Sequence, residues 1–203
     1  LIKKAQAYQL SALPNLNGFQ ITMGRLLITY YVSSGNFELA KKELDTMEGT
    51  LSGLKRSRGY MEYGPIWEGG YESARGIYFS GQGQWLESER SLRKTLHILE
   101  AQYQKVKNSS NKIDVVGDNV RAATDATNNP RVYVTQISNR ELNLANVLLR
   151  QRKLIDAEFY ARKSITLSQS SFGSNAIEVA RGLRTLATIV NEQGRYTEAV
   201  LLS

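Results

Sequence analysis

Hydrophobic residues along the chain recur every three or four positions, which is the spacing of one face of an α-helix. One such run contains Leu144, Leu148 and Leu149, and another contains Leu186 and Val190. Only three prolines interrupt the 203 residues. The strict alternation of apolar and polar residues that is typical of a strand is almost absent. The pattern therefore predicts an all-α chain.

Short polar turns that contain glycine separate the predicted helices. They occupy residues 33–36, 80–84 and 192–195, and an aromatic residue and a helix-forming stretch follow each of them. Glycine is common where a helix ends in the left-handed conformation, because it has no side chain that would clash there. We therefore expect the helices to come in pairs joined by these turns.

The same kinds of residue recur at fixed distances from each turn. With Gly35, Gly83 and Gly194 as origins, and Arg152 as the origin of a fourth frame, a small residue lies seven positions earlier in three of the four frames. A large side chain lies two positions later, and Ala or Ser lies five positions later. Small residues at these positions would let the two helices of a pair approach closely. Because no single pair can bury its apolar face alone, the pairs must stack.

This pattern resembles the tetratricopeptide repeat family, and the match is best over residues 152–203. The 42 residues between Arg152 and Gly194 (194 − 152) are similar to the longer variant found in kinesin light chains and many bacterial proteins. Ala176 and Ile177 stand where that variant usually has a His-Pro pair. The resemblance implies a right-handed α-solenoid of antiparallel helix pairs.

The resemblance also implies a domain organisation. Residues 1–203 would form a single repeat domain, a fragment of a longer protein, since the chain starts at Leu1 and stops inside a helical pattern. Residues 1–13 are expected to add a partial helix. The approximate repeats are 20–57, 64–107, 131–170 and 177–203, with an irregular insertion at 108–130.

Composition removes several classes of chemistry. The chain has no cysteine, which excludes disulfides, thiolate metal sites and a cysteine nucleophile. Its single histidine, His97, excludes sites built on several histidines and is expected to be a partnered or surface residue. No glycine-rich phosphate loop or EF-hand loop is present. We therefore expect no catalytic residue, metal or cofactor, and no enzyme activity in this region.

Two clusters leave alternatives open. Seven aromatic residues fall within residues 60–85, with Tyr63, Trp67 and Tyr71 spaced four apart. They either pack between the first two helix pairs or form an exposed patch that grips a partner. Basic residues gather at 55–58, 90–94 and 150–153, and the net charge is +7. They form either a solvated surface or, if continuous, a nucleic-acid site.

In the family that this sequence resembles, ligands usually lie on the concave surface formed by the first helix of each pair. Carried over residue by residue, that implies partner-binding positions at Arg25, Thr29, Ser73, Asn139, Asn143, Asn146, Arg150, Arg181, Arg184 and Asn191. Some members clamp the carboxylate of a peptide C-terminus with Asn and Lys or Arg, a pairing that favours charged hydrogen bonds. The match to such a clamp is incomplete, because Leu142 stands at the position of a clamp lysine.

The expected function is protein–protein recognition, in which a groove binds an acidic or polar segment of a partner protein or peptide. One alternative is a regulatory or sensor region of a larger protein, such as a caspase-like peptidase of the CHAT type, with the catalytic domain outside this chain. A nucleic-acid-binding helical repeat is the other alternative, and we do not favour it. No apolar run reaches the length of a membrane span. The cytoplasm is favoured and export stays open, as does self-association through an apolar end near Leu201 and Leu202.

Overall fold

A computed structural model of the chain describes residues 17–56, 60–110 and 129–202. These residues form helices and turns and contain no strand, so the predicted all-α class is confirmed. The partial helix expected at residues 1–13 lies outside the described residues. The irregular insertion expected at 108–130 is shorter than predicted, because residues 108–110 belong to a helix and Pro130 begins the next one, and its residues 111–128 lie outside the described part of the chain. The helices are α2 (Asn17–Ser33), α3 (Phe37–Leu54), α4 (Tyr60–Gly81), α5 (Trp85–Ser110), α7 (Pro130–Arg150), α8 (Leu154–Phe172), α9 (Ile177–Glu192) and α10 (Tyr196–Leu202).

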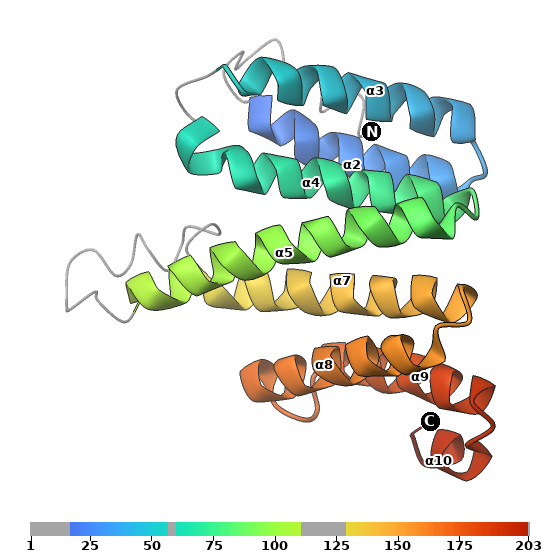
Figure 1. The fold of residues 1–203 in the computed structure, drawn as a ribbon. Helices are drawn as coiled ribbons and strands as arrows, with labels where there is room; N and C mark the ends of the chain where they lie inside the picture. The colour runs from blue at the N-terminus through green and yellow to red at the C-terminus, as the bar shows by residue number, and fades with distance from the viewer. Residues whose placement is uncertain (1–16, 57–59, 111–128, 203) are drawn as a thin grey trace. The chain divides into compact units, whose positions relative to one another are not determined.

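The chain divides into two compact units. Unit 1 comprises Leu1–Ile98 and unit 2 comprises Leu99–Ser203, so the boundary falls within α5. Each unit is built from antiparallel helix pairs joined by tight turns (Figure 1). The helix pairs lie at the predicted repeats. That these repeats form one continuous domain stays a prediction.

All four predicted turns share one backbone geometry. Gly35, Gly83 and Gly194 have φ angles of 73°, 73° and 80°, and Arg152 has a φ of 62°. At the first turn, the amide of Asn36 donates to the carbonyl of Tyr31 (2.8 Å), and that of Gly35 donates to the carbonyl of Val32 (3.1 Å). The same pair of bonds recurs at the other three turns. This is the Schellman motif, which satisfies the carbonyls at the end of a helix.

Unit 1 has a core to which α2, α3 and α4 all contribute, and each of these helices contacts the other two. A Cβ atom built on Gly70 would lie 2.7 Å from Cγ2 of Ile21, so the bare glycine lets α4 approach α2 closely. Trp67 and Tyr71 pack against this core and Tyr78 is buried in it. These three rings therefore pack as the first alternative predicts, whereas Tyr63 of the same cluster is 38% exposed.

At three of the four turns, the small residues predicted at the helix crossings lie in the interior. In unit 1, a Cβ on Gly76 would come within 3.0 Å of Cγ of Leu92, and the hydroxyl of Ser88 donates to the carbonyl of Gly76 (2.8 Å). In unit 2, Ala145 of α7 and Ala157 of α8 are fully buried. At the Gly194 turn, the corresponding Ala187 and Ala199 are only half-buried.

Unit 2 has α7 and α8 packed together, with α9 contacting both of them and α10 contacting α9. Leu144, Leu148, Leu186 and Val190, which defined the sequence periodicity, are all buried. Two first helices, α7 and α9, therefore lie side by side, which is the arrangement that a groove along them requires.

Candidate functional site

The surface of α7 carries four of the predicted partner-binding residues. Asn139 and Asn143 are half-buried, whereas Asn146 and Arg150 are exposed. Spacings of four, three and four residues place all four on one face of the helix. The capping residue after the helix, Gln151, closes α7 directly beyond Arg150. This face is therefore exposed towards the C-terminal end of α7, at Asn146 and Arg150.

The neighbouring helix α9 carries three more of the predicted residues. Arg181, Arg184 and Asn191 are all exposed, and spacings of three and seven residues again place them on one face. Since α9 contacts α7, the two sets of polar residues belong to adjacent helices of one compact unit.

The arginines of this candidate site differ in their partners from the arginines of the turns and of α8. Within the described residues, the guanidinium groups of Arg150, Arg181 and Arg184 make no ion pair and no side-chain hydrogen bond. The arginines in the turns and on α8 are instead neutralised, in the pairs Arg152–Glu192 (2.6 Å), Arg162–Glu198 (2.7 Å) and Arg195–Glu158 (2.7 Å). Positive charge that is free to meet a ligand thus gathers on the first helices.

The three predicted partner-binding residues of unit 1 are less available to a ligand than those of unit 2. Arg25 is half-buried, and burial lowers the pKa of its guanidinium. Thr29 is exposed, but its hydroxyl donates to the carbonyl of Arg25 on its own helix (2.9 Å). Ser73 is only 2% exposed, beside the fully buried Ala74. The prediction for Ser73 is corrected, because the rotation of α4 points this side chain into the interior rather than towards a groove.

The structure bears on the carboxylate clamp as well. Leu142, at the position of a clamp lysine, is 8% exposed. The α7 face that includes this position supplies packing rather than a cation, so the polar residues of α7 do not complete such a clamp.

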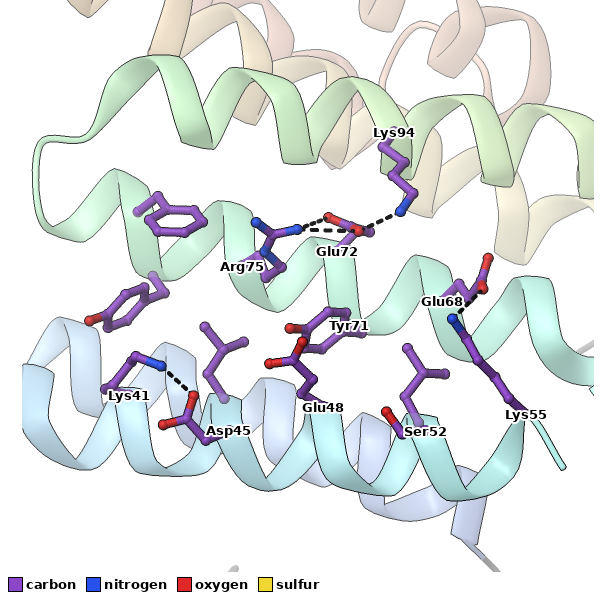
Figure 2. Close-up of a pocket in the computed structure, with 14 residues that line it drawn as sticks. Lys41, Asp45, Glu48, Ser52, Lys55, Glu68, Tyr71, Glu72, Arg75 and Lys94 are labelled. Atoms are coloured by element: carbon purple, nitrogen blue, oxygen red, sulfur yellow. Dashed lines mark hydrogen bonds and ion pairs between the residues drawn. The ribbon is translucent and has the colours of Figure 1, made fainter.

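A pocket of about 420 Å³ lies on unit 1, and it contains none of the predicted residues (Figure 2). Its walls come from α3 and its capping residue Lys55 and from α4, with Lys94 from α5. The charged groups lining it largely neutralise one another through the pairs Lys41–Asp45, Lys55–Glu68 (3.7 Å), Arg75–Glu72 (3.3 Å) and Lys94–Glu72 (2.7 Å). The sequence signal that could have found it is the row of charges along α3, spaced three and four residues apart.

Aromatic rings and a guanidinium shape the middle of this pocket. The Cζ atom of Arg75 lies 6.0 Å from the ring centre of Tyr71 and 5.5 Å from that of Phe79, which are cation–π distances. Burial and the nearby charge of Glu48 raise the pKa of Tyr71 to about 12. The phenol therefore stays protonated at neutral pH, and Arg75 already occupies the aromatic faces that a ligand cation would seek.

The basic clusters that suggested nucleic acid are mostly paired with acids. Lys55 and Lys94 contact glutamates in the pocket, and Arg90 and Arg93 pair with Glu87 and Glu89 along α5. His97 is exposed. Among the described residues, no three acidic or histidine side chains come together as a metal site would require. The helices in this part of the chain all fall short of the length and apolarity of a membrane span.

Solved structures of other proteins are similar to this chain in fold. The crystal structure of BtubC (BKLC) from P. vanneervenii matches with a TM-score of 0.66 at 15% identity, covering 99% of this chain and 66% of that one. The chain thus spans just under two thirds of that protein's length. Two crystal structures of a putative kinesin light chain with nearly identical TPR-like repeats from Podosopora anserina, one of them a variant with a single substitution, align at 12% identity with TM-scores of 0.41 and 0.38, covering 91% of this chain and 92% of theirs. No curated protein compared matches the sequence.

The likeness to BtubC shows the fold, so the predicted α-solenoid of helix pairs is confirmed. Residues 136–202 match the family model described as tetratricopeptide repeat. These residues run from α7 to α10 and include the turns at Arg152 and Gly194, whose left-handed conformations stand 42 residues apart (194 − 152). Repeats of this family are generally non-catalytic and serve as protein-interaction modules. Residues 136–202 thus form tetratricopeptide repeats.

Proposed function

We propose that this chain binds an acidic segment of a partner protein along α7 and α9 of unit 2. The observation that carries the proposal is a set of three guanidinium groups on two helices that contact each other, Arg150, Arg181 and Arg184, which have no ion pair with any described residue. Elsewhere in unit 2, arginines such as Arg162 and Arg195 already have acidic partners.

The chemistry of the site suits such a ligand. Arginine gives a carboxylate two parallel charged hydrogen bonds, which are stronger than neutral ones. Asn143 and Asn146 each offer a donor and an acceptor, which match the amides of an extended peptide backbone. Helices that are already packed lose little conformational freedom on binding, and the net charge of +7 attracts an acidic segment from a distance. The same groove could serve within a larger regulatory protein.

The test uses the whole chain and a fluorescein-labelled peptide of about a dozen residues that alternates Glu with Ser. The double variant Arg181→Glu/Arg184→Glu is expected to weaken binding by at least about tenfold, because attraction becomes repulsion at two contacts. A matched control, Lys105→Glu/Lys107→Glu, makes the same change of charge on exposed residues of α5.

Two results would overturn the proposal. Equal weakening by both double variants would mean that the peptide senses overall charge rather than this groove. Unchanged affinity in the groove variant, with an unchanged circular dichroism spectrum, would remove α9 from the site. A single-stranded oligonucleotide that binds more tightly than the peptide, with a steep loss of affinity in salt, would favour the nucleic-acid alternative instead.

A further inference from the structure

Two of the helix pairs carry a buried glutamate on the first helix that faces a lysine on the second. In unit 1, Glu72 and Lys94 lie 11 residues before and after Gly83, and Nζ of Lys94 is 2.7 Å from Oε1 of Glu72. The equivalent pair in unit 2 is Glu141 and Lys163, whose Nζ and Oε1 atoms are 3.0 Å apart. The side chain of Glu141 is 0% exposed. Neither pair was predicted, because an isolated glutamate in a helical sequence gives no sign that it is buried.

The two pairs differ in their third member. Glu72 also receives the guanidinium of Arg75 (3.3 Å), so one carboxylate lies between two cations. In unit 2, Nζ of Lys163 also lies 2.5 Å from Oε1 of Glu100 on α5, so one cation lies between two carboxylates. Equivalent positions therefore hold opposite excess charges.

The surroundings of Glu141 disfavour its ionised form. Neither of its carboxylate oxygens has a hydrogen-bond partner of good geometry among the described residues, so its contact with Lys163 is an ion pair without a directed hydrogen bond. Burial, only partly offset by Lys163 and reinforced by the charge of Glu100, raises the pKa of Glu141 to about 7.

Other charged groups near α7 do not alter this balance. The facing charge from α8 is Lys163, and the facing charge from α5 is Glu100. The helix α9 also contacts α7, and none of its charged side chains makes an ion pair with Glu141 in the described part of the chain. Those side chains are Glu178, Arg181, Arg184 and Glu192.

We propose that Glu141, Lys163 and Glu100 form a proton-sensitive switch inside unit 2. Above neutral pH the carboxylate of Glu141 is charged, and Lys163 bridges α5, α7 and α8. When the carboxylate of Glu141 takes up a proton, Lys163 is left paired with Glu100 alone. Glu141 belongs to the same helix as the proposed binding groove, but the switch does not depend on the groove.

The direction of the effect on stability follows from linkage. The folded state holds the proton of Glu141 more tightly than the unfolded state, whose pKa is near the ordinary 4.5. The contribution of this group to stability is therefore fully present below about pH 4.5 and is lost as the pH rises through about 7. Across that range the unfolding equilibrium constant should rise by a factor on the order of 100 from this group alone.

The direct test is a pH titration of the whole chain, labelled with carbon-13 at the glutamate carboxyl groups and followed by NMR. We expect one glutamate to titrate near pH 7 and its resonance to be missing in Glu141→Gln. The same variant should resist urea better than the natural chain at pH 8 and lose that advantage at pH 5. If every glutamate titrates below about pH 5.5, the switch does not exist.

Two further variants distinguish the switch from a purely structural role of Glu141. Glu100→Gln, at a side chain that is 43% exposed, should lower the titration midpoint, because Lys163 is then no longer shared. Lys163→Met should raise the midpoint, and Glu72→Gln, the matched change in unit 1, should leave it where it was. A midpoint that ignores both Glu100→Gln and Lys163→Met would overturn the proposal, even if Glu141→Gln did not fold.

Discussion

Successive helix pairs are joined differently in the two units. In unit 1, the aromatic side chains of α4, including Trp67, Tyr71 and Tyr78, pack against the core formed with α2 and α3. In unit 2, α9 packs on α8 through Gly182, where a Cβ would come within 2.5 Å of Cγ1 of Ile165. Ion pairs between side chains at the edge of that contact reinforce it.

The ionic rim of unit 2 centres on one carboxylate. Glu158 of α8 accepts hydrogen bonds from Gln193 (2.9 Å) and Arg195 (2.7 Å), which lie in the turn before α10. It also accepts from Arg162 of its own helix (2.8 Å), and Arg162 reaches on to Glu198 (2.7 Å). The same turn geometry thus supports two kinds of joint, because the turn satisfies its own backbone groups and leaves the chemistry between pairs free to vary. One joint should depend on ring volume, and the other on salt and pH.

The largest effect is expected from removing an aromatic ring in unit 1. Trp67→Ala should lower the free energy of unfolding by about 2–3 kcal/mol, somewhat below the cost for a fully buried ring, because Trp67 is only partly buried. The loss includes its contacts with Tyr60 and Tyr63, at ring-centre distances of 6.3 and 6.1 Å. Trp85, the second of the two tryptophans of the chain, remains in unit 1 and reports urea unfolding by its fluorescence.

The control for this prediction is Trp67→Phe, which keeps a ring and should cost less than about 1.5 kcal/mol. The cost of Trp67→Ala should be the same at 0.1 and 1 M NaCl, because no charge is removed. A strong dependence on salt, or a loss below about 1 kcal/mol, would show that unit 1 is not held by its rings.

The second effect is expected in the ionic joint. Glu158→Gln should cost about 1–2 kcal/mol in dilute buffer, because three donors lose a charged acceptor whose side chain is 18% exposed. Much of that cost should disappear in 1 M NaCl, where the natural chain's ion pairs are also weakened. Urea unfolding followed by far-ultraviolet circular dichroism, with hydrogen exchange of α9 and α10 as a local readout, measures both quantities.

This joint also predicts a pH dependence. Burial raises the pKa of Glu158, but its bonds with Gln193, Arg162 and Arg195 outweigh burial, so the net pKa is below the ordinary value. Its stabilising contribution is then present above about pH 4.5 and is lost as the pH falls, the reverse of Glu141 in the same unit. Glu87→Gln, in an exposed pair with Arg90, is the control and should cost less than about 0.5 kcal/mol in any salt.

The sequence was sufficient for the features that repeat along the backbone. Polar stretches around Gly35, Gly83 and Gly194 identified three turns, and the residues that recur at fixed distances from them identified Arg152 as a turn residue although it is not glycine. These features are local, because a left-handed residue and a small residue seven positions earlier depend only on one helix pair.

Features that depend on the rotation of a helix, or on partners far away in the sequence, were not predicted from the sequence. Ser73 was assigned to a surface, because a helical position gives only an approximate direction and α4 is turned so that Ser73 faces inwards. The joint around Glu158 brings together residues up to 37 positions apart, and the pocket on unit 1 needs three helices at once. A spacing pattern in one sequence does not contain such pairings.

The smallest effect is expected at the turn of Arg152, where a strained backbone conformation and an ion pair involve the same residue. Arg152 is in the left-handed conformation, which costs a residue with a side chain about 1 kcal/mol relative to glycine. Arg152 also pairs with Glu192 at 2.6 Å, but its side chain is 72% exposed, so that pair contributes only about 0.2–1 kcal/mol. In dilute buffer Arg152→Gly should therefore change the stability by less than about 0.8 kcal/mol.

Salt separates the two contributions. In 1 M NaCl the ion pair is screened while the backbone gain persists, so Arg152→Gly should become stabilising by about 0.5–1 kcal/mol in urea unfolding. The reverse change at an equivalent turn, Gly194→Ala, has open space for the new methyl group and should lose about 1 kcal/mol at both salt concentrations. If Arg152→Gly destabilises the chain equally at low and high salt, the arginine contributes something other than its pair with Glu192. The ionic character of the joint would then not extend to this turn.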